Sequence, residues 1–390
     1  MKILVVVPSF FPATVYGGPI FSTLHTCQEL AKLENINVNV STTNANMTSK
    51  LDVKTDEWEK LDEHFFVKYY NETKINVLSL SLLFNVWKDI RNSDVVHAQY
   101  MFSTPTPIAL FYAKVFSKPI LLSPRGALCK WCLEQGSRFK KLWLGLLIRP
   151  FVKSLYWHAT AQQEKDEILA QFPNAQVEII PNGIEFDVFQ TYNRVTSKEF
   201  CKTYAQQATD IDGEKIIVSM GRLQKKKGFD ILIDAFAKIM PDYPTAKLFI
   251  AGQDEKEGGN LTRQIAGLGL EQQVFLVGEI QGQDKIDFLA NADLFVLPSH
   301  NENFGNVYVE SLAAGTPIVA STGTPWSEVE DTNCGKWVNN SVEETAQAML
   351  EMLGKDREQM RENAKRLAKK YDWKNIAIEF KKLFEKMTHE

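Results

Sequence analysis

The chain has 390 residues, which is too long for one ordinary hydrophobic core and predicts two α/β domains of about 100–200 residues each. Hydrophobic residues make up 44% and charged residues 24%, and the formal net charge of −4 excludes the strong basic field that favours nucleic acid. Apolar runs such as 1–7 and 142–148 are too short to span a membrane, so the sequence predicts a cytoplasmic protein.

The first half alternates short β-branched runs with amphipathic stretches, which is the pattern of a parallel-sheet α/β domain. Residues 3–7 form the first expected strand, and a loop rich in Pro and Gly separates it from a helix expected at 19–33. The further strands are expected at 38–41, 95–97, 120–123, 158–160 and 177–180, and the further helices at 108–115 and 164–172. Residues 1–190 are therefore predicted to form one Rossmann-like domain.

A polar stretch at 186–213 separates the halves, and the same pattern then restarts. The strands of the second half are expected at 216–220, 246–251, 274–277, 294–298 and 317–320, and its helices at 229–240, 306–315 and throughout 341–390. Residues 213–370 are predicted to form a second Rossmann-like domain. Because parallel sheets bind ligands at the carboxyl ends of their strands, we expect the two domains to face a central cleft.

The clearest chemical signal is a pair of carboxylates eight positions apart around the start of a helix. Glu302 lies in the loop and Glu310 about one turn inside the helix. The loop between Glu302 and the helix reads Asn303, Phe304, Gly305 and Asn306. Gly305 lets a ligand approach the backbone, and the free N–H groups of a helix start suit phosphates or sugar hydroxyls. The alternative interpretation is an N-capping loop with two solvated carboxylates.

A second signal follows the strand expected at 216–220 and has the pattern glycine, cation, cation, glycine before a helix. Arg222 offers a fork of donors and Lys227 a compact charge, which together suit a phosphate group. The segment is not a P-loop, because GxxxxGK[ST] is absent. We interpret Lys225 and Lys226 as solvated lysines, and Arg222 and Lys227 as ligand-binding.

Together these motifs resemble the large family of retaining glycosyltransferases called family 4, or glycosyl transferases group 1, which has the GT-B fold. The motifs that carry the resemblance are, in chain order, the glycine loop Gly17-Gly18, the strand end Asp94-Val95-Val96-His97, the turn Pro181-Asn182-Gly183-Ile184, the segment from Gly221 to Gly228 that matches G-R-L-x-x-x-K-G, and the E-x7-E signature of Glu302 and Glu310. They cover nearly the whole chain. The resemblance implies that residues 1–190 bind the acceptor, that 213–370 bind a nucleotide sugar, and that 371–390 form a helix that crosses back to the first domain.

The resemblance also implies roles for single residues. Arg222 and Lys227 would neutralise the donor diphosphate, and Glu310 would bind the ribose. Glu302 would hold the transferred sugar together with the loop that follows it. The whole donor-binding set that the resemblance implies is Gly17, Gly18, Arg222, Lys227, Glu302, Asn303, Phe304, Gly305, Asn306 and Glu310.

One loop departs from the family pattern. Many members carry a His after the strand that corresponds to 120–123, where this chain has Ser123-Pro124-Arg125-Gly126. Arg125 would either take that place near the reacting sugar or bind an anionic acceptor, and His97 would lie near the acceptor. The candidate catalytic residues are therefore Glu302, Arg222, Lys227, His97 and Arg125.

The implied reaction moves a hexosyl group from a nucleoside diphosphate sugar to an acceptor hydroxyl with retention, in polysaccharide or glycoconjugate biosynthesis. The acceptor would be a saccharide or a lipid-linked saccharide. Since Arg222 and Lys227 supply positive charge, we expect neither a metal site nor a cofactor. Two alternatives are a GT-B nucleotide-sugar epimerase and a non-catalytic nucleotide-sugar-binding subunit, and the base, the sugar and the acceptor are left open.

Residues 125–158 contain seven basic residues and one acidic residue, Glu134, interleaved with Trp131 and several Leu. The basic residues are Arg125, Lys130, Arg138, Lys140, Lys141, Arg149 and Lys153. This mixture suits the surface of an anionic membrane and predicts peripheral attachment at its inner face. The alternative is an ordinary helix that packs Leu144, Leu147 and Phe151 into a core.

The chain has five cysteines, and an odd number argues against a complete disulfide framework. Cys129 and Cys132 have the CxxC spacing of redox and zinc sites. A zinc site would need a second ligand pair, which the sequence lacks, so we expect reduced thiols beside an active-site loop.

Overall fold

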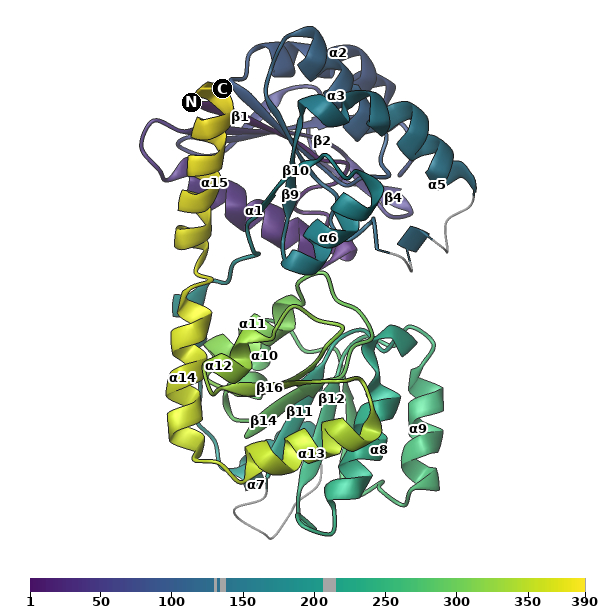
Figure 1. The fold of residues 1–390 in the computed structure, drawn as a ribbon, viewed down its shortest axis with the longest axis vertical. Coiled ribbons are helices and arrows are strands. Elements are labelled where there is room, and N and C mark those ends of the chain that lie inside the picture. Colours follow the sequence, from purple (N-terminus) through teal and green to yellow (C-terminus); the bar gives the residue numbers. More distant parts are fainter. Residues whose placement is uncertain (130–131, 134–137, 206–214, 390) are drawn as a thin grey trace. The chain divides into compact units, whose positions relative to one another are not determined.

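The computed structural model describes residues 1–129, 132–133, 138–205 and 215–389. It contains two compact units: unit 1 comprises Met1–Gly183 with Trp373–Glu390, and unit 2 comprises Ile184–Asp372 (Figure 1). Residues 184–190, which the sequence analysis placed with the first half, belong to unit 2, where Phe189 is buried in the core. Lys130, Trp131 and Glu134 of the basic segment, and the expected domain limit at 213, lie outside the described residues.

The sheet of unit 1 has the strand order β10-β9-β8-β7-β1-β2-β6-β5, and every pair is parallel except β5 with β6. Its strands are β1 (Lys2–Val6), β2 (Asn37–Thr43), β5 (Trp58–Asp62), β6 (Phe65–Tyr70), β7 (Val95–Gln99), β8 (Ile120–Ser123), β9 (Leu155–Ala159) and β10 (Gln176–Ile179), and a separate hairpin pairs β3 (Ala45–Asn46) with β4 (Ser49–Lys50). The helices of unit 1 are α1 (Gly18–Ala31), α2 (Leu80–Arg91), α3 (Pro105–Val115), α5 (Arg138–Trp143), α6 (Gln162–Gln171) and α15 (Trp373–His389), with the shorter η1 (Thr14–Tyr16), η2 (Leu144–Ile148) and η3 (Arg149–Ser154).

The central strands of unit 1 are almost entirely buried, because helices cover both faces of the sheet (Figure 1). Helix α15 closes one face and buries Trp373, Phe380 and Phe384 in the core. Gly183 is required at this point, since a Cβ there would lie 2.3 Å from the Trp373 ring. The last helix of the chain is therefore an integral part of unit 1.

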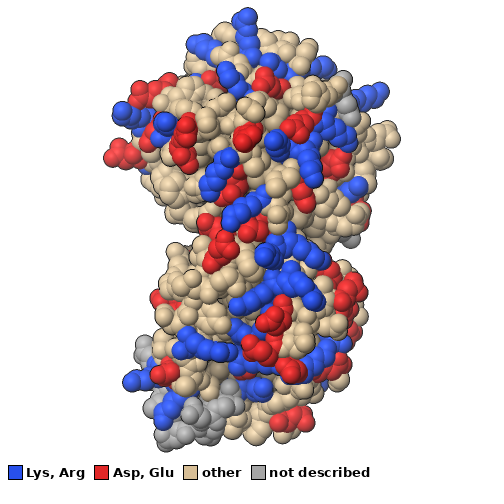
Figure 2. Space-filling model, turned by 90° about the vertical axis from the view of Figure 1, so that its left-hand side faces the viewer, with Lys and Arg blue, Asp and Glu red and all other residues tan. Residues whose placement is uncertain are grey.

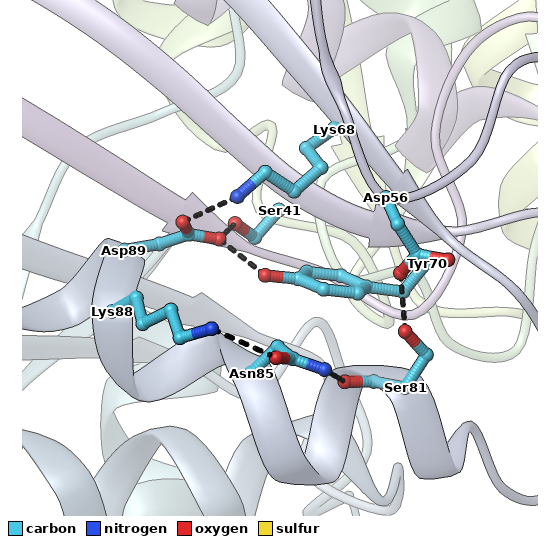
Figure 3. A network of polar contacts seen from close by, with 8 residues as sticks. All are labelled: Ser41, Asp56, Lys68, Tyr70, Ser81, Asn85, Lys88 and Asp89. Carbon is cyan, nitrogen blue, oxygen red and sulfur yellow. Dashed lines mark hydrogen bonds and ion pairs between the residues drawn. The ribbon is translucent and has the colours of Figure 1, made fainter.

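A buried polar network ties helix α2 to the sheet of unit 1 (Figure 3). Asp89 of α2 accepts hydrogen bonds from Lys68 at 2.6 Å, from Ser41 at 2.8 Å and from Tyr70 at 2.5 Å. Burial, together with the nearby charge of Asp89, raises the pKa of Tyr70. The Lys68 and Asp89 side chains are only 12% and 5% exposed, so each needs the opposite charge of the other to offset the cost of its own burial.

Unit 2 repeats the doubly wound pattern with the strand order β13-β12-β11-β14-β15-β16, all parallel. Its strands are β11 (Ile216–Met220), β12 (Lys247–Ala251), β13 (Val274–Gly278), β14 (Leu294–Leu297), β15 (Ile318–Ser321) and β16 (Gly335–Val338). Its helices are α7 (Ser197–Ala205), α8 (Phe229–Ile239), α9 (Gly258–Gly267), α10 (Gly282–Ala290), α11 (Asn306–Ala313), α12 (Glu328–Asp331), α13 (Val342–Leu353) and α14 (Arg357–Lys369), with the shorter η4 (Phe186–Gln190) and η5 (Lys225–Lys227).

The expectation of continuous helix over 341–390 was wrong. Three helices, α13, α14 and α15, occupy this stretch with breaks between them. Gly354 ends α13, and Asp356 begins α14 by accepting a hydrogen bond from the backbone N–H of Gln359 at 3.0 Å. Within the described part of the chain, no helix combines the length and the apolar character that crossing a membrane requires.

Candidate functional site

The cation segment of unit 2 is the turn between strand β11 and helix α8. Gly228 ends this turn with a φ of 68°, and a Cβ there would lie 2.2 Å from the Pro298 carbonyl oxygen. The backbone N–H of His300 donates to the Lys226 carbonyl oxygen at 2.8 Å. Glycine therefore lets the turn lie directly against the carboxyl end of β14, which brings Lys227 to the loop that carries Glu302.

Lys227 and Glu302 form a partly buried ion pair with 2.5 Å between Nζ and Oε1. Their side chains are 16% and 12% exposed. Ser299 donates to the same carboxylate oxygen at 3.0 Å, and the backbone N–H of Glu302 donates to the Gly323 carbonyl oxygen at 2.9 Å. The carboxylate is thus fixed in place by a cation, a hydroxyl and its own backbone.

The loop after Glu302 is shaped by a glycine and an aromatic cluster. Gly305 adopts a φ of 77° just before α11, and a Cβ there would lie 2.6 Å from the Tyr308 ring. Phe304 is buried, and its carbonyl oxygen accepts a hydrogen bond from Trp326 Nε1 at 2.7 Å. Phe304 therefore anchors the loop through its side chain and can offer a ligand only its backbone, while Asn306 begins the helix.

The other two charged candidates of unit 2 have partners that the sequence analysis did not identify. Glu310 accepts from Lys285 of α10 at 2.8 Å, and Arg222 donates to Glu255 at 3.0 Å. A hydrogen bond from Gln224, and then the charge of Arg222, hold the pKa of Glu255 below its usual range. Glu255 follows β12 and so lies at the carboxyl edge of the sheet. This position could have identified it from the sequence as a neighbour of the candidate site.

The cation segment and the E-x7-E loop consequently lie together at the carboxyl edge of one sheet. Lys227 is tied to Glu302, whereas the Arg222 side chain is 62% exposed and can turn toward a ligand. This edge presents two cations, two carboxylates of the signature and the amino-terminal end of α11. Such a set suits a ligand that combines phosphates with hydroxyl groups.

In unit 1 the glycine loop leads into helix α1. Gly17 has φ 77° and ψ −148°, a conformation open essentially to glycine alone, and Gly18 is the first helical residue. A Cβ on Gly17 would meet no atom within 4 Å, so the backbone conformation, rather than packing, requires the glycine.

Arg125 lies just after strand β8, at the same edge of unit 1, with a φ of 58°. Its Nη2 and Nε donate to Gln99 Oε1 at 2.8 and 3.1 Å, and its Nη1 donates to Asn182 Oδ1 at 3.1 Å. Thr23 of α1 donates to the same Gln99 oxygen at 2.9 Å. Arg125 thus links the ends of β7 and β8 to the 182–183 turn, and Gln99 and Thr23 are site residues that the sequence analysis missed.

His97 lies in the core of unit 1, where it is 1% exposed and packs against the rings of Phe380 and Phe384. Its Nε2 lies 2.7 Å from Ser123 Oγ, which lies 2.7 Å from Nδ1 of His158. Burial lowers the pKa of His97, and burial together with the nearby Arg125 lowers the pKa of His158 to about 3. Both rings are therefore neutral at physiological pH.

The hydrogen bonds also define the tautomers of this chain. His158 Nε2 lies 2.7 Å from the Ile180 carbonyl oxygen and must donate to it, so its Nδ1 accepts from Ser123. Ser123 has one proton and therefore accepts from His97 Nε2–H. This chain of hydrogen bonds pairs both ring nitrogens of His158, the Ser123 hydroxyl and His97 Nε2, and the His97 ring is enclosed by the core.

A hollow of about 800 Å³ opens at the amino-terminal ends of the unit 1 strands, where Met1, Asp94, Pro119 and Leu155 line it. The Gly17 loop, Gln99 and Arg125 follow the carboxyl ends of those strands. The hollow is therefore separate from the candidate site. At the CxxC segment, the backbone N–H of Cys132 donates to Cys129 Sγ at 3.3 Å.

Comparison with known proteins gives the following matches. Residues 202–370 match the family described as glycosyl transferases group 1. An uncharacterized glycosyltransferase of Methanocaldococcus jannaschii is 33% identical over 226 residues, which are 55% of this chain and 56% of the relative. Mannosylfructose-phosphate synthase of Agrobacterium fabrum is 31% identical over 172 residues, 42% of this chain and 37% of that enzyme. The matches thus span about half, or less, of these curated relatives.

Among solved structures, Anabaena HepE in complex with UDP and glucose superposes on the chain with a TM-score of 0.72 at 19% sequence identity. The match covers 99% of this chain and 100% of HepE. Such a likeness concerns the fold, and it confirms the expected GT-B architecture of two Rossmann-like units.

Proposed function

Because residues 202–370 carry the glycosyl transferases group 1 domain and the chain has the GT-B fold, we propose that this protein transfers a sugar from a nucleoside diphosphate sugar to an acceptor hydroxyl. The observation that carries the proposal is the Lys227–Glu302 pair, 2.5 Å apart beside the start of α11. One member of this pair suits a phosphate and the other a sugar hydroxyl. The UDP and glucose named for HepE support a donor of this kind.

In this proposal the donor lies along the carboxyl edge of the unit 2 sheet. Lys227 and Arg222 bind the diphosphate, and Glu310 binds the ribose hydroxyls. Glu302 and the backbone N–H groups of Gly305 and Asn306 hold the transferred sugar. Gly17 and Gly18 offer the amino-terminal end of α1 to an anionic group of a substrate.

We propose retention of configuration by transfer on one face of the sugar. Glu302 is already bound by Lys227 and Ser299, which suits a positioning group better than a nucleophile. As the glycosidic bond to the diphosphate breaks, negative charge grows on the leaving oxygen, and Lys227 and Arg222 stabilise it. That oxygen then accepts the proton of the acceptor hydroxyl, which attacks the same face. The cations supply this stabilisation without a metal ion.

For the acceptor we propose a saccharide or a lipid-linked saccharide in polysaccharide or glycoconjugate biosynthesis, on the cytoplasmic side. Arg125, held by Gln99 and Asn182 at the carboxyl edge of unit 1, is the cation best placed for an anionic acceptor. We do not assign His97 to the reaction, because its ring is enclosed by the core.

The proposal is tested by thermal shift with UDP, GDP, ADP and their hexose derivatives, followed by a turnover assay with the donor that binds. A ligand present at 100 times its Kd should stabilise the protein by about 2.7 kcal/mol. A stabilising donor that is hydrolysed or transferred supports the enzyme. Binding without hydrolysis or transfer would instead indicate a non-catalytic nucleotide-sugar-binding subunit, and conversion of the sugar to its epimer would indicate an epimerase.

A further inference from the structure

Unit 1 exposes large apolar side chains on three neighbouring elements, α3, α5 and η2, and we call them together the α3–α5 surface. These elements are in contact, since α3 packs against η2 and η2 continues α5 (Figure 1). The surface consists of Phe111 and Val115 of α3, Phe139 and Leu142 of α5, and Leu146 and Leu147 of η2. All but Leu147 are more than half exposed, which is unusual for such a cluster in a water-soluble protein.

These helices do have a packed inner face, so the exposed apolar side chains are additional to the ones that pack in the core. Leu144 and Ile148 are buried in the unit 1 core, and Trp143 Nε1 donates to the Met101 carbonyl oxygen at 3.0 Å. Phe139, Leu142 and Leu146 follow the spacing i, i+3, i+7, so they form one outward stripe. The segment therefore has two apolar faces, one packed inward and one open.

The charge of these segments is entirely positive. Residues 105–118 and 138–154 contain seven basic and no acidic residues. The basic residues are Lys114, Lys118, Arg138, Lys140, Lys141, Arg149 and Lys153. By contrast, the face of the chain with α15 mixes both signs (Figure 2), and α15 itself carries Glu379 and Glu385 among its lysines.

The basic residues are not equivalent. Lys140 turns inward, donating to the Cys132 carbonyl oxygen at 2.7 Å with its Nζ 5.1 Å from the centre of the Phe102 ring. Lys141, Arg149 and Lys153 are exposed. Lys141 lies on α5, and the other two lie on η3, which follows η2 directly. These three exposed cations lie on α5, which carries part of the apolar stripe, and on η3, which follows the stripe in the chain.

We propose that the α3–α5 surface docks unit 1 on an anionic lipid bilayer. Exposed Phe and Leu side chains enter the interface between headgroups and acyl chains, while exposed Lys and Arg bind the anionic headgroups. Nucleic acid has the charge but not the apolar layer to match this surface. A protein partner would need a face that is both apolar and acidic. A bilayer with anionic lipids offers both an apolar layer and negative charge. This docking goes beyond the transfer reaction and does not depend on it.

The test is co-sedimentation of the full chain with vesicles of phosphatidylcholine alone or with anionic phosphatidylglycerol. Binding is expected only with the anionic lipid, and it should weaken between 0.1 and 1 M salt because the Debye length falls from about 10 to about 3 Å. The Lys141→Glu/Lys153→Glu variant should bind at least about 30-fold less, from about 1 kcal/mol for each lysine. Leu142→Ser/Leu146→Ser should also lose binding at low salt.

Matched controls use exposed residues of unit 1 outside the α3–α5 surface. Lys54→Glu/Lys60→Glu makes the same change of charge, and Ile378→Ser removes an apolar side chain that is 42% exposed on α15. Both should bind vesicles like the unaltered protein, and all variants should keep the thermal shift by nucleoside diphosphate. Equal loss in the controls, or no binding to anionic vesicles at 0.1 M salt, overturns the proposal. The proposal is also overturned if the chain does not bind vesicles but self-associates, and if Leu142→Ser/Leu146→Ser abolishes that self-association.

Discussion

Lys227 Nζ lies 2.5 Å from Glu302 Oε1, although 75 positions separate the two residues in the chain. The contact forms because β11 and β14 are neighbours in the sheet of unit 2 and both loops start at the carboxyl ends of these strands. Gly228 lets the first loop lie on the backbone of Pro298. In the proposed function, a donor phosphate takes the place of Glu302 as the partner of Lys227, and a sugar hydroxyl becomes the partner of Glu302.

The first prediction concerns the cations. Lys227→Ala and Arg222→Ala should each weaken nucleoside diphosphate binding by about 1.5–3 kcal/mol, or roughly 10- to 150-fold, because each removes a charged hydrogen bond to phosphate. Lys225→Ala, at an exposed position of the same turn, is the control and should have little effect. Isothermal titration measures all three. Unchanged affinity in both variants would remove the phosphate-binding assignment.

The second prediction separates the two carboxylates. Glu310→Gln should weaken nucleoside binding, because Glu310 lies inside α11, whereas Glu302→Gln should mainly slow transfer. Glu302→Gln also leaves Lys227 without its ion-pair partner, so affinity for the diphosphate should be kept or rise. Affinity and turnover are measured for both variants. If Glu302→Gln alone abolished nucleotide binding, the two roles would have to be exchanged.

The sequence predicted the core of this site because charged residues that follow parallel strands converge at one edge of the sheet. It did not predict that Glu255 and Lys285 pair with Arg222 and Glu310, since these contacts depend on where loop 252–257 and helix α10 lie. Nor could it show that Phe304 is buried against Trp326, because aromatic packing across 22 positions follows from the whole fold.

The fold was predicted least well between residues 45 and 91. Strand β5 has every side chain exposed, so it lacks the apolar alternation that indicates a strand. Helix α2 carries Asp89 on its inner face, and this polar residue breaks the apolar stripe of the helix. A carboxylate there can be buried only because Lys68 and Tyr70 come from the sheet to meet it, which a local pattern does not reveal.

The Asp89 network gives the third prediction. Asp89→Ala should lower the free energy of unfolding of unit 1 by about 3–5 kcal/mol, because Lys68 would stay buried without a counter-charge. Glu57→Ala breaks the exposed Lys54–Glu57 pair and should change stability little. Urea denaturation compares the two. An Asp89→Ala variant as stable as Glu57→Ala would show that Lys68 reaches water.

The fourth prediction is that transfer continues in the presence of EDTA. Arg222 and Lys227 place positive charge at the edge where the leaving diphosphate would lie, so we expect no added cation to be needed. Turnover is measured with excess chelator, and again after Mg²⁺ or Mn²⁺ is restored. Activity lost in EDTA and recovered with either ion would refute the metal-free mechanism.

The last prediction uses the buried histidines. His97 and His158 remain neutral in the folded state because burial lowers the pKa of each, to about 3 for His158. In the unfolded chain both take up protons below their ordinary value of about 6.5. The unfolded chain therefore binds more protons than the folded chain below pH 6.5. The folded state keeps its full stability above pH 6.5 and loses stability as the pH falls toward 3. Well below pH 6.5, His158 should cost about 1.4 kcal/mol of folding stability per pH unit until the pH approaches 3, and His97 should act in the same direction.

The measurement is hydrogen exchange of the β7 and β8 amides between pH 7.5 and 5, corrected for the intrinsic pH dependence of exchange. Between pH 6.5 and 5 His158 alone should lower the stability of unit 1 by roughly 1.5–2 kcal/mol, and His97 should add to this loss. His158→Gln should reduce this pH dependence, whatever its effect on stability at pH 7.5, and His64→Gln, at an exposed position, should leave it unchanged. A pH dependence equally steep in His158→Gln would mean that the chain from His97 through Ser123 to His158 opens to solvent, and His97 would then again be a candidate for contact with a substrate.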